Sequence, residues 1–166
     1  MPVFLSLGSN LGDREGYLDR AVRALEDAPG IRVVSVSRII ESEPMGEVDQ
    51  PAYLNMAVGI ETTYEPLELL DRVKSLEREL GRTHTRRWGP REIDIDIVLW
   101  DDRTCSDDRL TVPHPEFRKR AFVLVPLAEI APDAVDPETG KTVGELLVSP
   151  EAAGALRTYH SAGNKA

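Results

Sequence analysis

The chain has 166 residues and is 41% hydrophobic, which suits one domain with a substantial core. Its formal net charge of −9 argues against general binding of nucleic acids or anionic membranes, because broad phosphate binding needs a basic face. We therefore expect no nucleic-acid or membrane partner, although converging arginines could still bind one phosphorylated small molecule.

The first part of the chain alternates between β-rich and helical patterns. Residues 3–7 predict a strand that ends in GSNLGD, a turn rich in Gly and Asn at 8–13. A helix should follow to about Ala28, with Asp13 as its N-cap. Residues 31–42 are again β-rich and predict a second strand.

The next part repeats this alternation. A third strand is expected from Tyr53 to Thr62, and Pro66 then opens a second helix at a position that tolerates proline. Gly81 ends that helix. The loop RTHTRRWGPR, residues 82–91, leads to a fourth strand at 92–100.

The resulting order, β-α-β-β-α-β, predicts an α+β fold with a ferredoxin-like core, an antiparallel sheet with helices packed on it. Beyond residue 100 we expect a short strand and short helices. We interpret residues 1–166 as a single domain in which the tail from about 150 is peripheral.

Three further features bear on where the protein works. Cys105 is the one cysteine, so no internal disulfide is possible, and a lone thiol fits a reducing compartment. The N-terminus has no signal-peptide pattern, and the apolar segment at 121–132 is too short to span a bilayer. We expect a cytoplasmic monomer.

Asp94 and Asp96 interrupt the otherwise apolar fourth strand, IDIDIVLW. Alternation along a strand puts both carboxylates on one face with Val98 and Trp100, and the isoleucines and Leu99 on the other, toward a core. One interpretation is a charged edge strand that discourages edge pairing. We expect instead a strand inside the sheet with an open aspartate face, where neighbouring carboxylates raise each other's pKa. Mg²⁺ would remove that repulsion, so the pair predicts a metal–nucleotide site.

Arginines crowd the loop that enters this strand. Arg82, Arg86, Arg87 and Arg91 could form a solvated basic loop, or they could contact phosphates and charge that develops during phosphoryl transfer. A loop of this length could also close over a nucleotide. Trp88 could cover a ring or simply pack.

Other candidates are more ambiguous from sequence alone. GSNLGD lacks the G-K-[ST] ending of a phosphate-binding loop and is best interpreted as a turn. Asn55 is an amide in an apolar segment, so it is either a core hydrogen-bonding group or a ligand contact. Tyr53 and Phe122 could be core residues or could sandwich a flat heterocycle. His114 lies between two prolines. A single histidine of this kind more often has a structural role than a catalytic one.

Four stretches together resemble a known family. SLGSNLGD, DQPAYLNMAV, RRWGPREIDIDIVL and LTVPHPEFRKRAFVLVPLAEIAP are similar, in order and spacing over about residues 4–133, to the 6-hydroxymethyl-7,8-dihydropterin pyrophosphokinases of folate biosynthesis. The resemblance implies a ferredoxin-like fold. It also implies transfer of an intact pyrophosphoryl group from ATP to the hydroxymethyl oxygen of the pterin, with AMP as the second product.

The resemblance also implies roles for individual residues. Two Mg²⁺ ions would bind Asp94 and Asp96, and Arg82 and Arg91 would act with these aspartates as the catalytic set. The implied ATP contacts are Glu77, Arg82, Arg91, Arg109, Thr111, His114 and Arg120. The implied pterin contacts are Ser42, Pro44, Met45, Tyr53, Asn55, Trp88, Asp94 and Phe122.

Two other functions fit parts of the pattern. A two-metal nucleotidyl transferase or nuclease would need a basic track, and a charge of −9 argues against one. A ligand-sensing module without catalysis has no need for paired aspartates beside four arginines. Phosphoryl or pyrophosphoryl transfer accounts for both features, and the resemblance implies the second.

Overall fold

The computed structural model describes residues 2–43, 50–81, 92–152 and 156–158. The elements in chain order are β1 (Val3–Ser9), α1 (Arg14–Asp27), β2 (Ile31–Val36), β3 (Ile40–Ser42), β4 (Tyr53–Thr62), α2 (Pro66–Glu79), β5 (Asp94–Trp100), β6 (Cys105–Ser106), β7 (Thr111–Val112), the 3-10 turn η1 (Phe117–Lys119), α3 (Ala121–Ile130), α4 (Val143–Leu147) and β8 (Leu156–Thr158). In these described ranges no helix has both the length and the apolar composition to cross a membrane.

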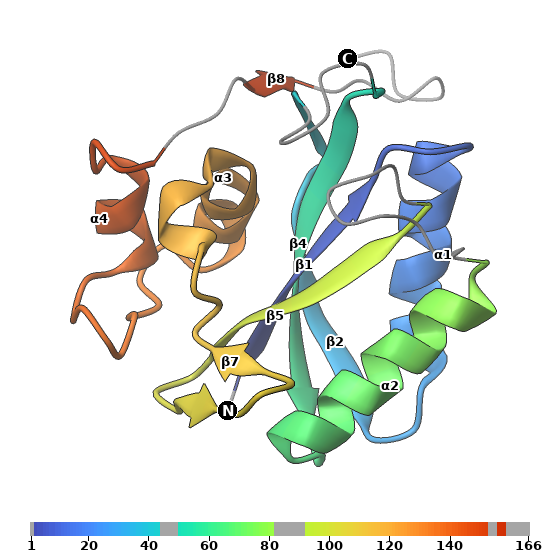
Figure 1. Cartoon of the computed structure of the whole chain (residues 1–166), viewed down its shortest axis with the longest axis horizontal. Helices are drawn as coiled ribbons and strands as arrows, with labels where there is room; N and C mark the ends of the chain where they lie inside the picture. Colours follow the sequence, from blue (N-terminus) through green and yellow to red (C-terminus); the bar gives the residue numbers. More distant parts are fainter. Residues whose placement is uncertain (1, 44–49, 82–91, 153–155, 159–166) are drawn as a thin grey trace.

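The main sheet has the strand order β5-β1-β4-β3-β8, and β2 also pairs with β4. All of these pairings are antiparallel. Figure 1 shows α1 and α2 on one side of the sheet and α3 and α4 on the other. The α+β fold with a ferredoxin-like core is therefore confirmed.

The helix boundaries follow the local sequence signals. The Asp13 carboxylate accepts a hydrogen bond from the backbone N–H of Gly16 at 3.1 Å, as expected for the N-cap of α1. Pro66 is in the first turn of α2, and Gly81 follows that helix with a φ of +98°, a conformation that glycine adopts without steric cost. Caps and breakers thus end both helices where the sequence predicts.

The expected single strand at 31–42 is instead two strands, β2 and β3. Ser37 lies between them, and its hydroxyl accepts a hydrogen bond from the Ala57 backbone N–H at 2.8 Å. The Ser37 N–H in turn donates to the Ala57 carbonyl at 2.9 Å. A side chain therefore replaces part of the strand ladder, and both halves still pair with β4.

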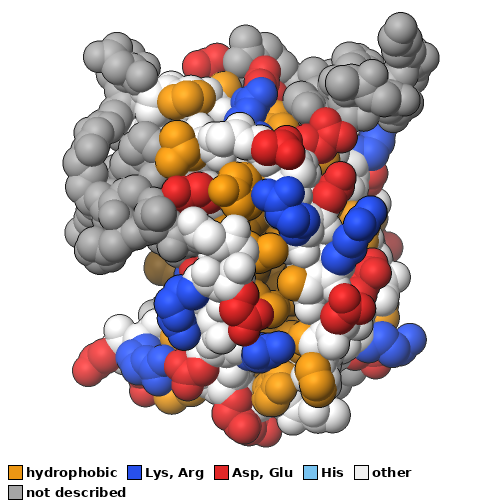
Figure 2. Space-filling model, turned by 90° about the vertical axis from the view of Figure 1, so that its right-hand side faces the viewer, with side chains coloured by type: hydrophobic (Ala, Val, Ile, Leu, Met, Phe, Trp, Pro, Cys, Tyr) orange, Lys and Arg blue, Asp and Glu red, His pale blue; other side chains and the backbone are white. Residues whose placement is uncertain are grey.

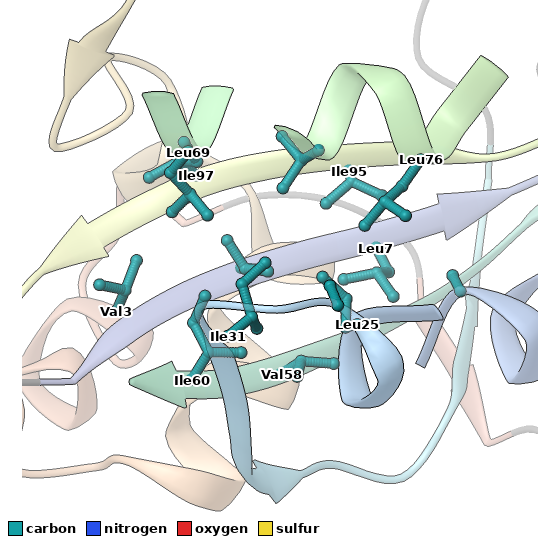
Figure 3. Packing of buried hydrophobic residues seen from close by; sticks show 14 of the residues in the cluster. Val3, Leu7, Leu25, Ile31, Val58, Ile60, Leu69, Leu76, Ile95 and Ile97 are labelled. Carbon is teal, nitrogen blue, oxygen red and sulfur yellow. The ribbon is translucent and has the colours of Figure 1, made fainter. Parts of the chain in front are cut away.

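The larger core lies between the sheet and the pair α1 and α2. Figure 3 shows Leu69 and Leu76 of α2 pointing toward Ile97 and Ile95 of β5, and all four side chains are buried. Burial of each such side chain contributes about 1.5–3 kcal/mol. The isoleucines of β5 therefore hold this strand under α2, as the alternation predicts.

Two expectations about β5 are wrong. The strand lies at the end of the sheet order rather than inside it, because β1 separates it from the central strand β4. The aspartate face is also only partly open, because Phe4, Ala57 and Val98 on that face form a second core with Phe117, Val123 and Leu124 of the C-terminal segment. The weakly patterned residues beyond 100 thus cover part of the aspartate face of the sheet.

The side-chain alternation of β5 also fails in its last part. β1 and β5 change register between Phe4 and Leu5, and Val98 is passed over in the pairing. This bulge puts Leu99 on the face of the second core and Trp100 on the face of α1 and α2, opposite to the predicted sides. Asp94 and Asp96 precede the bulge, so the prediction holds for them.

Surface charge on the α1–α2 side is mixed. Figure 2 shows Lys and Arg side chains interspersed with Asp and Glu over this face. On α2 itself, Asp71 is ion-paired with Arg109. This view shows no broad basic track among its coloured residues, in keeping with the net charge.

Candidate active site

A glycine lies between the acidic strand and the strand that carries the candidate pterin contacts. Gly8 of β1 is opposite Asp94 of β5 on one side and opposite Asn55 of β4 on the other. Partners across an antiparallel ladder share a face. Asp94 and Asn55 therefore flank a position without a side chain. We call this uncovered part of the sheet, at Gly8, the floor of the site.

The space above Gly8 is narrow. A Cβ added there would lie 3.2 Å from Asn55 Oδ1 and 3.4 Å from Tyr53 Cδ1. GSNLGD is predicted from its sequence only as a turn, and that prediction misses this role of its first residue. The signal was weak, because only the strand register shows what lies on either side of Gly8.

Asp94 and Asp96 are half-buried on this same face. Burial raises the pKa of Asp96 to about 7, with the charge of Asp94 as the second cause and that of Glu77 as a smaller one. A bound cation would offset all three effects. The expected repulsion between the paired carboxylates is therefore present.

The residues fit a Mg²⁺ site that is completed by a ligand. In the described part of the chain no group of three or more His, Cys, Asp or Glu side chains could hold a metal by itself. Mg²⁺ is usually bound by one or two carboxylates, with waters and substrate phosphates as the remaining ligands. Two hard oxygen donors on one strand face match that pattern.

Positive charge reaches the aspartates from two other elements. Lys74 of α2 and Arg120, just before α3, both lower the pKa of Asp96, so they lie near enough to act on its charge. Arg120 was a predicted ATP contact, whereas Lys74 was missed. Its signal was its position three residues before Glu77, which puts both side chains on one helix face.

His114 lies beside this cluster as a neutral ring. Burial, and secondly the charge of Arg120, lower the pKa of His114 to about 4. Its Nδ1 accepts a hydrogen bond from the Glu116 backbone N–H at 3.1 Å, so Nε2 carries the proton and can donate to an anion. Its own backbone N–H donates to the Val98 carbonyl of β5 at 2.9 Å.

On the side of the floor where Asn55 lies, two buried polar side chains are hydrogen-bonded to each other. Asn55 and Ser42 are each 3% exposed, and Asn55 Nδ2 donates to Ser42 Oγ at 2.6 Å. Phe122 of α3 packs against the core on this face, and the Arg120 guanidinium lies 5.6 Å from its ring centre. The structure thus brings together five of the predicted pterin contacts on one face: Ser42, Tyr53, Asn55, Asp94 and Phe122.

Two other predicted ATP contacts lie on the hairpin of β6 and β7. Thr111 is exposed on β7, and Arg109 precedes it and is paired with Asp71 of α2. The hairpin therefore lies beside α2. Glu77, also predicted at ATP, is buried in α2 and bonds the backbone of β5.

Several predicted residues lie outside the described part of the chain. These are Pro44, Met45, Arg82, Trp88 and Arg91, together with the neighbouring Arg86 and Arg87. Their proposed roles rest on the sequence alone.

A second set of buried hydrogen bonds, made by Asn10, was not predicted from the sequence. Asn10 has no exposed surface, and its Nδ2 donates to Gln50 Oε1 at 2.8 Å and to the Pro51 carbonyl at 3.0 Å. These bonds join the end of β1 to the segment that enters β4. They therefore hold the two strands whose residues flank the floor at Gly8.

Comparison with known proteins gives one consistent result. Residues 4–132 match the family model described as 7,8-dihydro-6-hydroxymethylpterin-pyrophosphokinase. A 2-amino-4-hydroxy-6-hydroxymethyldihydropteridine pyrophosphokinase of Methylorubrum extorquens is 49% identical over 155 residues, which cover 93% of this chain and 97% of that protein. The protein of the same name from Bacillus subtilis is 49% identical over 128 residues, 77% of each chain.

A solved structure supports the fold. The Plasmodium falciparum HPPK-DHPS structure superposes with a TM-score of 0.70 at 15% identity, over 88% of this chain. The match spans 42% of that longer chain. At this identity the likeness establishes the architecture, while the relatives above establish the family.

Proposed function

The chain belongs to the 7,8-dihydro-6-hydroxymethylpterin-pyrophosphokinase family, and we propose that it transfers the pyrophosphoryl group of ATP to 6-hydroxymethyl-7,8-dihydropterin. The hydroxymethyl oxygen attacks the β-phosphorus of ATP. The bond from that phosphorus to the α,β-bridging oxygen breaks, so AMP leaves and the hydroxyl proton is released. The products are AMP and the pterin pyrophosphate used in folate biosynthesis.

One observation carries this proposal. Asp94 and Asn55 flank Gly8 on a single face of the sheet, so the acidic strand adjoins a buried hydrogen-bonding pair. A flat ring above the glycine could be held at its edge by Asn55 and Ser42, with Tyr53 and Phe122 near its faces. Its hydroxymethyl arm would then lie on the side of Asp94.

The ATP side is supported by the charges around Asp96. Asp94 and Asp96 would hold Mg²⁺, two ions in our proposal. When bound, Mg²⁺ neutralises triphosphate charge and favours attack at phosphorus. Arg120, Lys74 and the Nε2 proton of His114 supply positive charge and a donor for the phosphates. Arg82 and Arg91 are proposed to steady the charge that develops during transfer.

This division of roles needs no covalent intermediate. Holding ATP and the pterin in line, and stabilising charge on the transferred group, are the main contributions that enzymes make to phosphoryl transfer. The chain's own groups would orient the two substrates and neutralise charge. In this proposal Asp94 also orients the proton of the hydroxymethyl group.

The direct test is a nucleotide assay. Purified protein, Mg²⁺, ATP and the hydroxymethyl-dihydropterin are incubated together, and the nucleotides are resolved by chromatography. AMP that forms only when the pterin is present is the expected result. ADP formation, or no turnover, would contradict the proposal.

Two variants sharpen this assay. Asp96→Asn should abolish AMP formation because it removes one of the two proposed metal-binding charges. Asp102→Asn is the matched control, because Asp102 is exposed and follows the same strand. Equal loss in both variants would mean that the effect of Asp96→Asn is not specific to the site.

A further inference from the structure

Side chains of α2 hydrogen-bond the backbone of β5 between the two aspartates, on the side of the strand away from β1. Ile95 lies between Asp94 and Asp96, and its backbone N–H donates to Glu77 Oε2 at 2.6 Å. Its carbonyl accepts a hydrogen bond from Lys74 Nζ at 3.3 Å. Two side chains of one helix therefore take the place that a neighbouring strand would have.

This arrangement is unusual for an edge strand. Edge strands generally leave their outer N–H and C=O groups to water, or protect them with charges and bulges. In β5 the outer groups of Ile95 are paired instead, and the bulge comes only later, at Val98. Farther along, the Val98 carbonyl accepts a hydrogen bond from the His114 N–H at 2.9 Å. The strand is thus bonded at both the acidic end and the bulge.

Burying the Glu77 carboxylate so that it can accept this hydrogen bond costs free energy. Its side chain is 2% exposed, and a buried carboxylate is tolerated only when it is paired and hydrogen-bonded. Lys74 provides the counter-charge at 3.3 Å, one helical turn away. A hydrogen bond from an N–H to an ionised carboxylate is stronger than one to a neutral acceptor.

The hydrogen bond between Ile95 and Glu77 bears on the site because Ile95 lies between the two aspartates. Its side chain packs under α2, as Figure 3 shows, while the side chains on either side of it point to the opposite face. Because both backbone groups and the side chain of Ile95 are held by α2, the two flanking aspartates have little freedom to move apart or together. Metal binding by two carboxylates depends on such support from surrounding groups.

We propose that Glu77 is a positioning residue for the metal pair: through the backbone N–H of Ile95 it sets the placement of Asp94 and Asp96. This inference rests on the proposed function, because it concerns the Mg²⁺ site of that reaction. It also replaces a direct ATP contact of Glu77, expected from the family resemblance, with an indirect role.

The test compares three variants of α2. Glu77→Ala removes the acceptor, and Glu77→Gln keeps an oxygen that can accept the same N–H. Glu79→Ala is the matched control, because it removes an exposed carboxylate from the same helix. If Glu77→Ala does not fold, Glu77→Met serves instead, since it nearly preserves volume but lacks a strong acceptor.

The first readout needs neither metal nor substrate. Amide hydrogen exchange of Ile95, followed by NMR in the metal-free protein, should accelerate in Glu77→Ala and stay near the wild-type rate in Glu77→Gln. Glu79→Ala should match the wild type. Unchanged exchange in Glu77→Ala would overturn the proposal, because the bond would then not protect the strand.

The second readout separates positioning from direct contact with ATP. Calorimetry gives the Kd for α,β-methylene-ATP, a nucleotide that cannot be cleaved at the bond in question, with Mg²⁺ and with EDTA. We expect Glu77→Ala to weaken binding roughly tenfold or more with Mg²⁺, as loss of a group that orients metal ligands does, and to leave the EDTA value unchanged. Glu77→Gln should recover most of the loss.

The outcomes also separate this inference from the proposed function. Equal weakening with Mg²⁺ and with EDTA would assign Glu77 to the nucleotide and refute the positioning role. Wild-type protein that makes no AMP, while exchange and Mg²⁺-dependent binding respond as expected, would refute the proposed reaction and leave the role of Glu77 intact.

Discussion

Replacing Asp96 by Asn should stabilise the metal-free protein at high pH while it removes activity. The folded pKa of Asp96 is about 7, above its ordinary value of 3.8, because of burial and the charge of Asp94. The folded state therefore binds more protons than the unfolded state between these two values. Stability must then fall as pH rises through this window.

The size of the effect follows from the two pKa values. Each pH unit between 3.8 and about 7 corresponds to about 1.4 kcal/mol, which sets an upper limit of about 4 kcal/mol. Asp96 is only half-buried, so water screens part of its charge, and we expect about 2 kcal/mol at pH 8. Asn has almost the same shape and carries no charge, so the variant avoids this cost.

The assay is urea denaturation in EDTA at several pH values between 4.5 and 8. The advantage of Asp96→Asn over the wild type should be small at pH 4.5 and grow toward pH 8. Asp102→Asn, an exposed control, should show no such trend. A constant difference between Asp96→Asn and the wild type across this range would refute the electrostatic reasoning.

Three further variants test other parts of the structure. Arg118→Ala should destabilise the protein by roughly 3 kcal/mol, because it leaves the fully buried Asp136 without its partner at 2.5 Å. Burial alone would raise the pKa of Asp136, but hydrogen bonds from Arg118 and its neighbours outweigh burial and lower it, so this loss should shrink as pH falls below about 4. Urea denaturation measures both effects, and a loss independent of pH would contradict the pairing. Gly8→Ala should raise the Kd for the pterin roughly tenfold, about 1.4 kcal/mol, because the new methyl group crowds Asn55; calorimetry with ATP analogue alone should show no change. Asp13→Ala should cost about 1 kcal/mol through loss of the α1 cap, with activity at low temperature unaffected.

The local elements were predictable because their signals lie in adjacent residues. Asp13 caps α1, Pro66 starts α2, and the isoleucines of β5 face the core, all as the sequence indicates. The order of strands in the sheet was harder, because it depends on pairing between distant segments. That is why β5 was expected inside the sheet and lies at its end.

The candidate site shows the same division. The paired aspartates, Asn55 and His114 attract attention as polar residues in apolar or rigid surroundings. Lys74 and Gly8 do not, since a lysine on a helix and a glycine before a turn are common. Their roles depend on which strand each one faces.

The amino-acid sequence by itself determined the family, the acidic pair and the secondary elements, because motifs, caps and side-chain alternation act over a few residues. Only the tertiary structure decided that Glu77 bonds the strand between the aspartates and that Gly8 separates Asp94 from Asn55. These contacts join residues far apart in the chain. Strand register and the packing of α2 bring them together, and neither can be read from neighbouring positions.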